Sequence, residues 1–128
     1  MTSDTLVHLR GVPVLECAPD GEKLRGAEDV LDVIGSAMGQ GAELVLLPAQ
    51  RLTDDFFTLR TGLAGEIAQK FVNYRIRLAI LGDISHHVAK SSALAAFVSE
   101  SNRAGQLWFV PTKEELDERL GQQRRRAT

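Results

Sequence analysis

The segment that decides the fold is FFTLRTGLAGEIAQKFVNYRIRLAILGDIS, residues 56–85. Its middle part repeats apolar side chains three and four residues apart, which predicts a helix over about 62–74. Residues 76–81 (IRLAIL) are almost all apolar, as expected for a strand that is covered on both faces. A helix that leads into a buried strand indicates an α/β fold with a mostly parallel sheet. Thr61 is the expected N-cap of the helix, because its hydroxyl can accept a free N–H, and 56–59 is expected to be a loop.

The flanking sequence continues the same alternation. Two short strands, 5–9 and 12–16, surround Arg10-Gly11 and predict a hairpin. Helices are expected at 27–38, at 91–102 and from Thr112 to about Leu120, where Thr112 and Glu115 have the spacing of a capping box. Further strands are expected at 43–47 and 107–110. The predicted order is ββαβαβαβα, a single α/β domain with a mixed, mostly parallel five-stranded sheet.

Composition limits the function. The chain has 128 residues and a net charge of −2, so we expect one domain over 1–121, no nucleic-acid partner and no membrane partner. An Arg-rich polar segment, 122–128, is expected to be a disordered tail. Cys17 is the only cysteine and excludes an intrachain disulfide. No apolar run approaches the length of a signal or spanning helix, and we expect a cytoplasmic protein.

The first candidate surface is a polar stripe on the predicted helix 62–74. At 100° per residue, Glu66, Gln69, Lys70 and Asn73 gather on one side. Either this is a solvated face with a Glu66–Lys70 ion pair, or it binds a protein partner or a second copy of the chain. Gly65 costs helix stability, so we expect it to allow a close approach by a neighbouring backbone or a partner.

The second candidate site follows strand 76–81. Asp83 and Ser85 stand where ligands bind in open α/β sheets, beyond the carboxyl ends of the strands. The alternative is that both residues only cap a turn and the next helix.

The sequence favours neither a metal site nor nucleophilic catalysis. His86 and His87 are adjacent, so on a helix their side chains diverge by about 100° and chelate one ion poorly. There is no G-x-S-x-G motif, and Cys17 has no histidine or cation near it in sequence. We expect no metal and no cofactor.

With these residues in view, the chain resembles a bacterial family of domains of unknown function over nearly its whole length. The resemblance rests on a set of short matching motifs that also includes Glu100 and Asn102. They are Phe56-Phe57, Thr61-Gly62-Leu63-Ala64-Gly65-Glu66, Gln69-Lys70-Phe71, Asn73-Tyr74, Gly82-Asp83 and Glu100-Ser101-Asn102. The family has no established activity, so the resemblance adds candidate residues rather than a function.

A more distant resemblance is to the STAS domain of anti-sigma-factor antagonists. The element order looks like that of STAS domains, and Thr61-Gly62-Leu63 is similar to the Ser-Gly-Leu of their Asp-Ser-Ser-Gly-Leu motif. In that family a partner kinase phosphorylates the serine before the glycine, and the matching position is Thr61. Leu59 and Arg60 replace the first two residues of the motif.

The resulting expectation is a non-enzymatic protein-interaction or ligand-sensing regulatory module of the bacterial cytoplasm, STAS-like in topology. Its partner would be a protein or a second copy, and a small ligand is compatible with it. The alternative is a small enzyme or small-molecule binder with a site at Asp83, Ser85 and the adjacent helix ends. A concave pocket with convergent polar groups would favour the alternative, and a flat exposed stripe would favour an interaction module.

Overall fold

A computed structural model of the chain describes the backbone of residues 4–127 and the side chains of 4–123. It begins with a hairpin of β1 (Thr5–Leu9) and β2 (Val12–Glu16), paired antiparallel. Arg10 and Gly11 in the turn have φ values of 53° and 79°. Positive φ at both central residues is the geometry of a type I′ turn, one of the two common turns of two-residue hairpins, and the predicted hairpin is confirmed.

Three further strands extend the sheet from β2, all parallel to it: β3 (Leu44–Pro48), β4 (Arg77–Leu81) and β5 (Leu107–Val110). The five strands lie in the order β1-β2-β3-β4-β5. Because each crossover connects neighbouring strands and has the usual hand, the crossover helices share one face of the sheet. The single α/β domain with a mixed five-stranded sheet is therefore as predicted.

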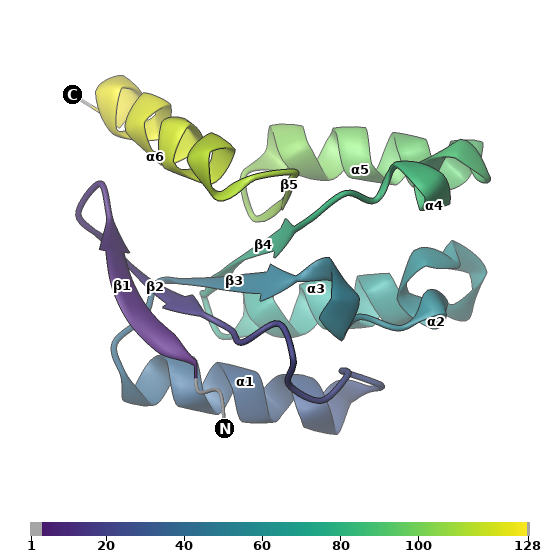
Figure 1. Cartoon of the computed structure of the whole chain (residues 1–128), viewed down its shortest axis with the longest axis horizontal. Coiled ribbons are helices and arrows are strands. Elements are labelled where there is room, and N and C mark those ends of the chain that lie inside the picture. Colours follow the sequence, from purple (N-terminus) through teal and green to yellow (C-terminus); the bar gives the residue numbers. More distant parts are fainter. Residues whose placement is uncertain (1–3, 128) are drawn as a thin grey trace.

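The crossover helices are α1 (Ala27–Gly39), α3 (Leu63–Asn73) and α5 (Ser92–Ala104) (Figure 1). They form the larger hydrophobic cluster with alternate residues of the strands, among them Leu15, Val45, Leu78 and Phe109. The predicted 62–74 helix begins and ends one residue inside its predicted bounds. Burial of about 25 cal/mol per Å² of apolar area is the main stabilising contribution on this face.

The other face of the sheet is covered by α6 (Lys113–Ala127). Leu116 and Leu120 pack there against a second cluster of strand residues. Thr112 Oγ1 accepts the N–H of Glu115 at 3.2 Å, which is half of the expected capping box. The helix runs to Ala127 rather than ending near Leu120, so residues 122–127, expected to be disordered, are helical here, and Thr128 lies outside the described residues.

Two one-turn helices were not predicted. α2 (Asp54–Phe57) replaces part of the loop expected at 56–59, and α4 (Ser85–Ala89) follows β4. Two 3₁₀ turns, η1 (Ala49–Arg51) and η2 (Leu59–Thr61), flank α2. A single turn is too short to show a hydrophobic period, which is why the sequence pattern missed both helices. Together, these short elements make up the two connections that leave the carboxyl ends of β3 and β4.

Candidate functional site

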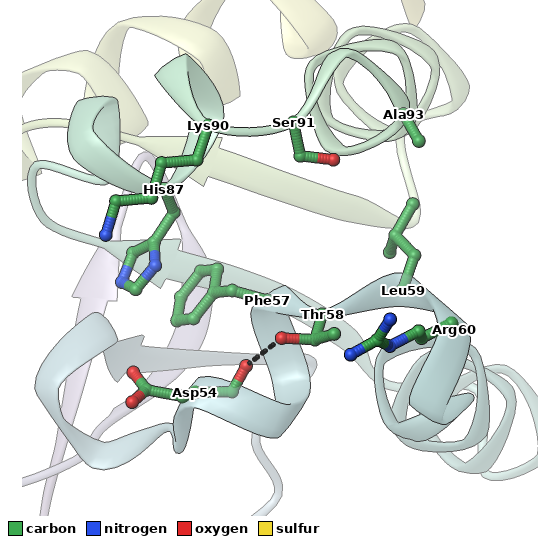
Figure 2. A pocket seen from close by; sticks show the side chains of 9 residues that line it. All are labelled: Asp54, Phe57, Thr58, Leu59, Arg60, His87, Lys90, Ser91 and Ala93. Atoms are coloured by element: carbon green, nitrogen blue, oxygen red, sulfur yellow. Dashed lines mark hydrogen bonds between the residues drawn. The ribbon is translucent and has the colours of Figure 1, made fainter.

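A cavity of about 540 Å³ lies between these two connections. One wall comes from α2 and η2, with Asp54, Phe57, Thr58, Leu59 and Arg60. The opposite wall comes from α4 and the start of α5, with His87, Lys90, Ser91 and Ala93 (Figure 2). We call it the strand-exit cavity, because both walls follow the carboxyl ends of neighbouring parallel strands. Open α/β sheets bind ligands beyond the carboxyl ends of their strands at a point where successive crossovers change face, whereas here both crossovers lie on one face, so the cavity shares only the strand-end position with such sites.

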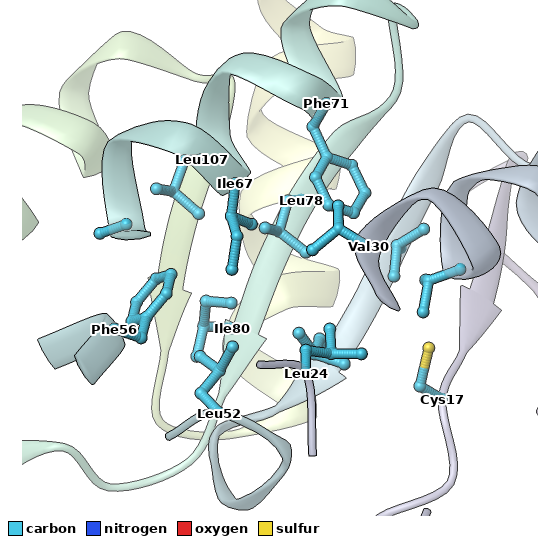
Figure 3. Close-up of a cluster of buried hydrophobic side chains, with 14 of the residues drawn as sticks. Cys17, Leu24, Val30, Leu52, Phe56, Ile67, Phe71, Leu78, Ile80 and Leu107 are labelled. Atoms are coloured by element: carbon cyan, nitrogen blue, oxygen red, sulfur yellow. The ribbon is translucent and has the colours of Figure 1, made fainter. Parts of the chain in front are cut away.

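An aromatic stack joins the two walls. The rings of Phe57 and His87 are parallel within 6°, and their centroids lie 4.0 Å apart. The exposed His86 ring lies 4.0 Å from His87, at 40°. Phe56 points the other way, into the main core beside Leu52 and Ile80 (Figure 3). Phe56 thus anchors α2 in the core, and Phe57, which also belongs to the core cluster, connects α2 to α4.

Two cationic side chains and one carboxylate line the cavity. Arg60 and Lys90 line it from opposite walls. In Figure 2 the Lys90 side chain extends past His87, away from Arg60, and Asp54 lies below His87. Among the described residues, neither the Arg60 nor the Lys90 side chain makes a hydrogen bond or an ion pair. Burial lowers the pKa of His87, and the positive potentials of His86 and Lys90 lower it further while Asp54 opposes them. A lowered pKa keeps His87 neutral at pH 7, so the cavity carries a net positive charge.

The hydroxyl groups on the cavity walls form hydrogen bonds with backbone groups. Thr58 Oγ1 donates to the carbonyl oxygen of Asp54 at 3.0 Å. Ser91 is the N-cap of α5, and its Oγ accepts the N–H of Leu94 at 3.1 Å. Both hydroxyls therefore stabilise the ends of the wall helices.

Thr61 and Gly62 lie just beyond this cavity. Thr61 ends η2, and Gly62, with φ of 80°, is the N-cap of α3, so the predicted cap position is wrong by one residue. The expected interaction is still present, because Thr61 Oγ1 accepts the N–H of Leu63 at 3.2 Å. The same hydroxyl lies 2.6 Å from the carbonyl oxygen of Asp55 and 2.9 Å from that of Thr58, to which it can donate.

The polar stripe follows on α3. Glu66, Gln69 and Asn73 are exposed and Lys70 is half-buried. Gln69 Nε2 donates to Asn73 Oδ1 at 2.9 Å, but the expected Glu66–Lys70 ion pair is not formed among the described residues.

Gly65 lies on the same helix, and a Cβ built on it would have no neighbour within 4 Å. The expectation that Gly65 admits a neighbouring backbone of this chain is therefore wrong. Whether a partner approaches it stays a prediction.

Asp83 and Ser85 form a turn at the start of α4. Asp83 Oδ1 accepts the N–H of Ser85 at 2.9 Å. Hydrogen bonding from the Ser85 side chain and from this backbone N–H lowers the pKa of the Asp83 carboxyl. Both residues are exposed, and neither lines the strand-exit cavity. The hydrogen bond forms the turn of the alternative considered for them, but the N-cap of α4 is Ile84, without a side-chain cap.

Glu100 and Asn102 lie near the other end of α5, where the chain turns into the start of β5. Glu100 forms an exposed ion pair with Arg103 at 2.7 Å. Asn102 Oδ1 accepts the N–H of Phe109 at 2.7 Å and so satisfies a backbone donor of an edge strand. The structure thus separates the candidates into three places: the Thr61–α3 region, the start of α4, and the end of α5.

Sequence reasoning named the neighbours of the cavity rather than its lining. Arg60 precedes Thr61, and His87 and Lys90 follow Ser85, yet these three were not proposed as site residues. The available clue was that both segments follow buried parallel strands, which places their side chains together at one edge of the sheet.

Within residues 4–127, no group of three or more His, Cys, Asp or Glu side chains gathers to hold a metal ion. Across the same residues, no helix has the length and apolarity needed to cross a membrane.

Comparisons with known proteins identify a family but no activity. No curated protein and no solved structure shows significant similarity to the chain. The model of one family, described as a domain of unknown function (DUF4180), matches residues 9–120. The match spans nearly the whole domain, as the resemblance to an uncharacterised family led us to expect. The chain therefore belongs to the DUF4180 family of domains of unknown function.

Proposed function

We propose that this domain is a non-enzymatic ligand-sensing module whose binding site is the strand-exit cavity. The observation that carries the proposal is the cavity itself, about 540 Å³ between Arg60 on one wall and Lys90 on the other. Its volume lies within the roughly 300–1,000 Å³ that small-molecule sites occupy. Apolar and charged groups converge there, which supports binding of one organic molecule.

The position of η2 supports a regulatory output. Leu59 and Arg60 of η2 line the cavity, and the next residues are Thr61, Gly62 and the first turn of α3. A ligand held by Arg60 would restrain η2 and thereby the start of α3. The exposed stripe of Glu66, Gln69 and Asn73 is the surface on which a protein partner, or a second copy, would sense that change.

The STAS likeness belongs to this proposal. The order of the major elements and the Thr61-Gly62-Leu63 match support a module that acts on a protein partner. In that scheme Thr61 would be a phosphorylation site, and the protein would work in the bacterial cytoplasm.

Ligand binding is favoured over catalysis because the side chains that could act as nucleophiles, Thr58, Ser91 and Cys17, are not activated. The Ser91 and Thr58 hydroxyls are hydrogen-bonded to backbone groups, and in the described part of the chain neither bonds to His87. Burial, together with the charge of Asp4, raises the pKa of Cys17 to about 12, so its thiol stays protonated at pH 7. The alternative site at Asp83 and Ser85 is a turn on the surface rather than a cavity.

The test is a titration of ¹⁵N-labelled protein with a set of neutral, cationic and anionic fragments, followed by NMR. We expect saturable shifts that cluster in residues 54–60 and 87–93. Ala93→Leu would fill the cavity and abolish them. Ala96→Leu is the matched control, because Ala96 is exposed on the same helix and does not line the cavity. Shifts confined to other surfaces, or unaffected by Ala93→Leu, would refute the proposal.

A further inference from the structure

We propose that the ligand of the strand-exit cavity is a small organic carboxylate, whose anionic head binds between Arg60 and Lys90 while its apolar body lies against Leu59 and Ala93. This inference rests on the proposed function and specifies the chemistry of the ligand.

The cations argue for an anionic ligand. Arg60 and Lys90 stand on opposite walls of one cavity, and among the described residues neither side chain has a hydrogen-bonding or ionic partner in the protein. Some other cations of this chain are paired, as Lys113 is with Glu16 and Arg103 with Glu100, whereas Lys23 and Lys70 form no ion pair among the described residues, so it is their shared cavity that distinguishes Arg60 and Lys90. Two cations that line one cavity favour an anionic ligand there, and a guanidinium matches a carboxylate with two parallel hydrogen bonds. In Figure 2 the Lys90 side chain extends past His87 and away from Arg60, so Lys90 must rotate to meet an anion that Arg60 holds.

The charge count favours a single negative charge on the ligand. Arg60 and Lys90 contribute +2, Asp54 contributes −1, and His87 is neutral, so the lining residues carry +1. One carboxylate neutralises this charge. A doubly charged phosphate ester would leave an excess negative charge next to Asp54, which costs free energy in a partly desolvated site.

The rest of the lining favours an organic body. Leu59 comes from η2 and Ala93 from the first turn of α5, and Figure 2 shows the Leu59 side chain extending toward Ala93. Phe57 adds an aromatic edge, although its face is covered by His87. An inorganic ion would leave this apolar surface wet, whereas an aromatic or branched carboxylate would cover it.

The experiment compares benzoate with benzamide, which have nearly the same shape and differ in charge. Each is titrated into the ¹⁵N-labelled domain at constant sodium concentration, with phenyl phosphate as a third probe. We expect benzoate to give saturable shifts in residues 54–60 and 87–93 at lower concentration than either benzamide or phenyl phosphate.

Three substitutions test the assigned groups. Arg60→Gln and Lys90→Gln should each weaken benzoate binding roughly three- to fivefold, as for a partly exposed charge pair. Asp54→Asn should strengthen it, because the site then carries a larger positive charge. Lys23→Gln is the matched control, since Lys23 is an exposed lysine that does not line the cavity, and it should leave binding unchanged.

The outcomes separate this inference from the proposed function. If benzamide binds in the cavity as well as benzoate does, or if the glutamine variants bind benzoate normally, the domain binds ligands there but the carboxylate assignment is wrong. If phenyl phosphate binds best, the anion is a phosphate. If none of the fragments or probes shifts the cavity residues, both proposals fail.

Discussion

The imidazole of His87 lies flat on the ring of Phe57, with the centroids 4.0 Å apart. This contact joins α4 to α2 and so connects the two walls of the cavity. Because each helix is a single turn, neither is stable without tertiary contacts. The stack is therefore a main determinant of the shape of the site.

Replacing His87 by alanine should loosen α4. We expect a loss of about 0.5–1.5 kcal/mol from the free energy of unfolding, the usual contribution of an aromatic pair, and faster hydrogen exchange in Ser85–Ala89. His87→Phe keeps a stacked ring and should retain both properties. Equal destabilisation by alanine and phenylalanine would show that stacking is not the stabilising contact.

The lowered pKa of His87 predicts a pH dependence of stability. Burial disfavours the charged imidazole, His86 and Lys90 disfavour it further, and Asp54 favours it, with a net decrease from the ordinary value of 6.5. Between the ordinary pKa of 6.5 and the lowered pKa of the folded state, the unfolded chain binds more protons than the folded one. The stability contribution is thus complete above about pH 6.5 and is lost as pH falls toward the lowered pKa.

Urea unfolding between about pH 7 and pH 5, above the range in which most carboxyl groups titrate, measures this contribution. His87→Phe should flatten the pH dependence relative to the unmodified protein. An identical slope in both proteins would contradict the assignment to His87.

Gly65→Ala should stabilise the domain by up to about 1 kcal/mol, because the new Cβ meets nothing within 4 Å and alanine is the better helix former. Gly62→Ala is the contrasting variant: Gly62 also has open space, but its φ of 80° strains any L side chain, at a cost of about 1–2 kcal/mol. Melting temperatures should therefore move in opposite directions. A decrease for Gly65→Ala would indicate a contact with a partner or a second copy.

Thr61→Ala should cost about 0.5–2 kcal/mol, because the hydroxyl accepts from Leu63 and can donate to Asp55. Thr61→Ser should restore most of that stability. Thr61→Glu places a carboxylate against the carbonyl oxygens of Asp55 and Thr58, where the hydroxyl donates, so it should destabilise the fold. Chemical denaturation distinguishes the three variants. If Thr61 is a phosphorylation site, the phosphate would then act by loosening η2, and an unaltered midpoint for Thr61→Glu would contradict that effect.

A buried arginine gives the last prediction. Arg51 is 7% exposed, and its Nη1 and Nε donate to the carbonyl oxygens of Ala18 and Glu22 at 2.8 and 2.5 Å. A Cβ on Gly21 would lie 2.6 Å from Arg51 Cζ, so Gly21→Ala must displace the guanidinium from these acceptors. We expect a loss of about 1–3 kcal/mol.

In an Arg51→Ala background, Gly21→Ala should cost much less, because the group that it displaces is gone. A double-mutant cycle in urea measures this coupling. Additive effects of the two substitutions would contradict a direct contact between Gly21 and the guanidinium.

The sequence alone determined the sheet and its main helices. Continuous apolar runs specified β3, β4 and β5, the Arg10-Gly11 pair specified the hairpin, and the 3.6-residue period specified α1, α3 and α5. These features are local, because backbone hydrogen bonding and the burial of one face require a pattern within a single element. The capping role of Thr112 was also readable, since it depends on residues only three apart.

Tertiary structure alone decided the candidate site. α2 and α4 are single turns that depend on contacts such as the Phe57–His87 stack. Each is too short to show the 3.6-residue hydrophobic period that predicts a helix. Arg60 and Lys90 come from different crossovers, and only the pairing of β3 beside β4 brings them to one cavity. Likewise, open space around Gly65 and the burial of Arg51 depend on what packs nearby. A linear pattern records which side chains an element carries, but the partners that surround them are set by the packing of distant segments.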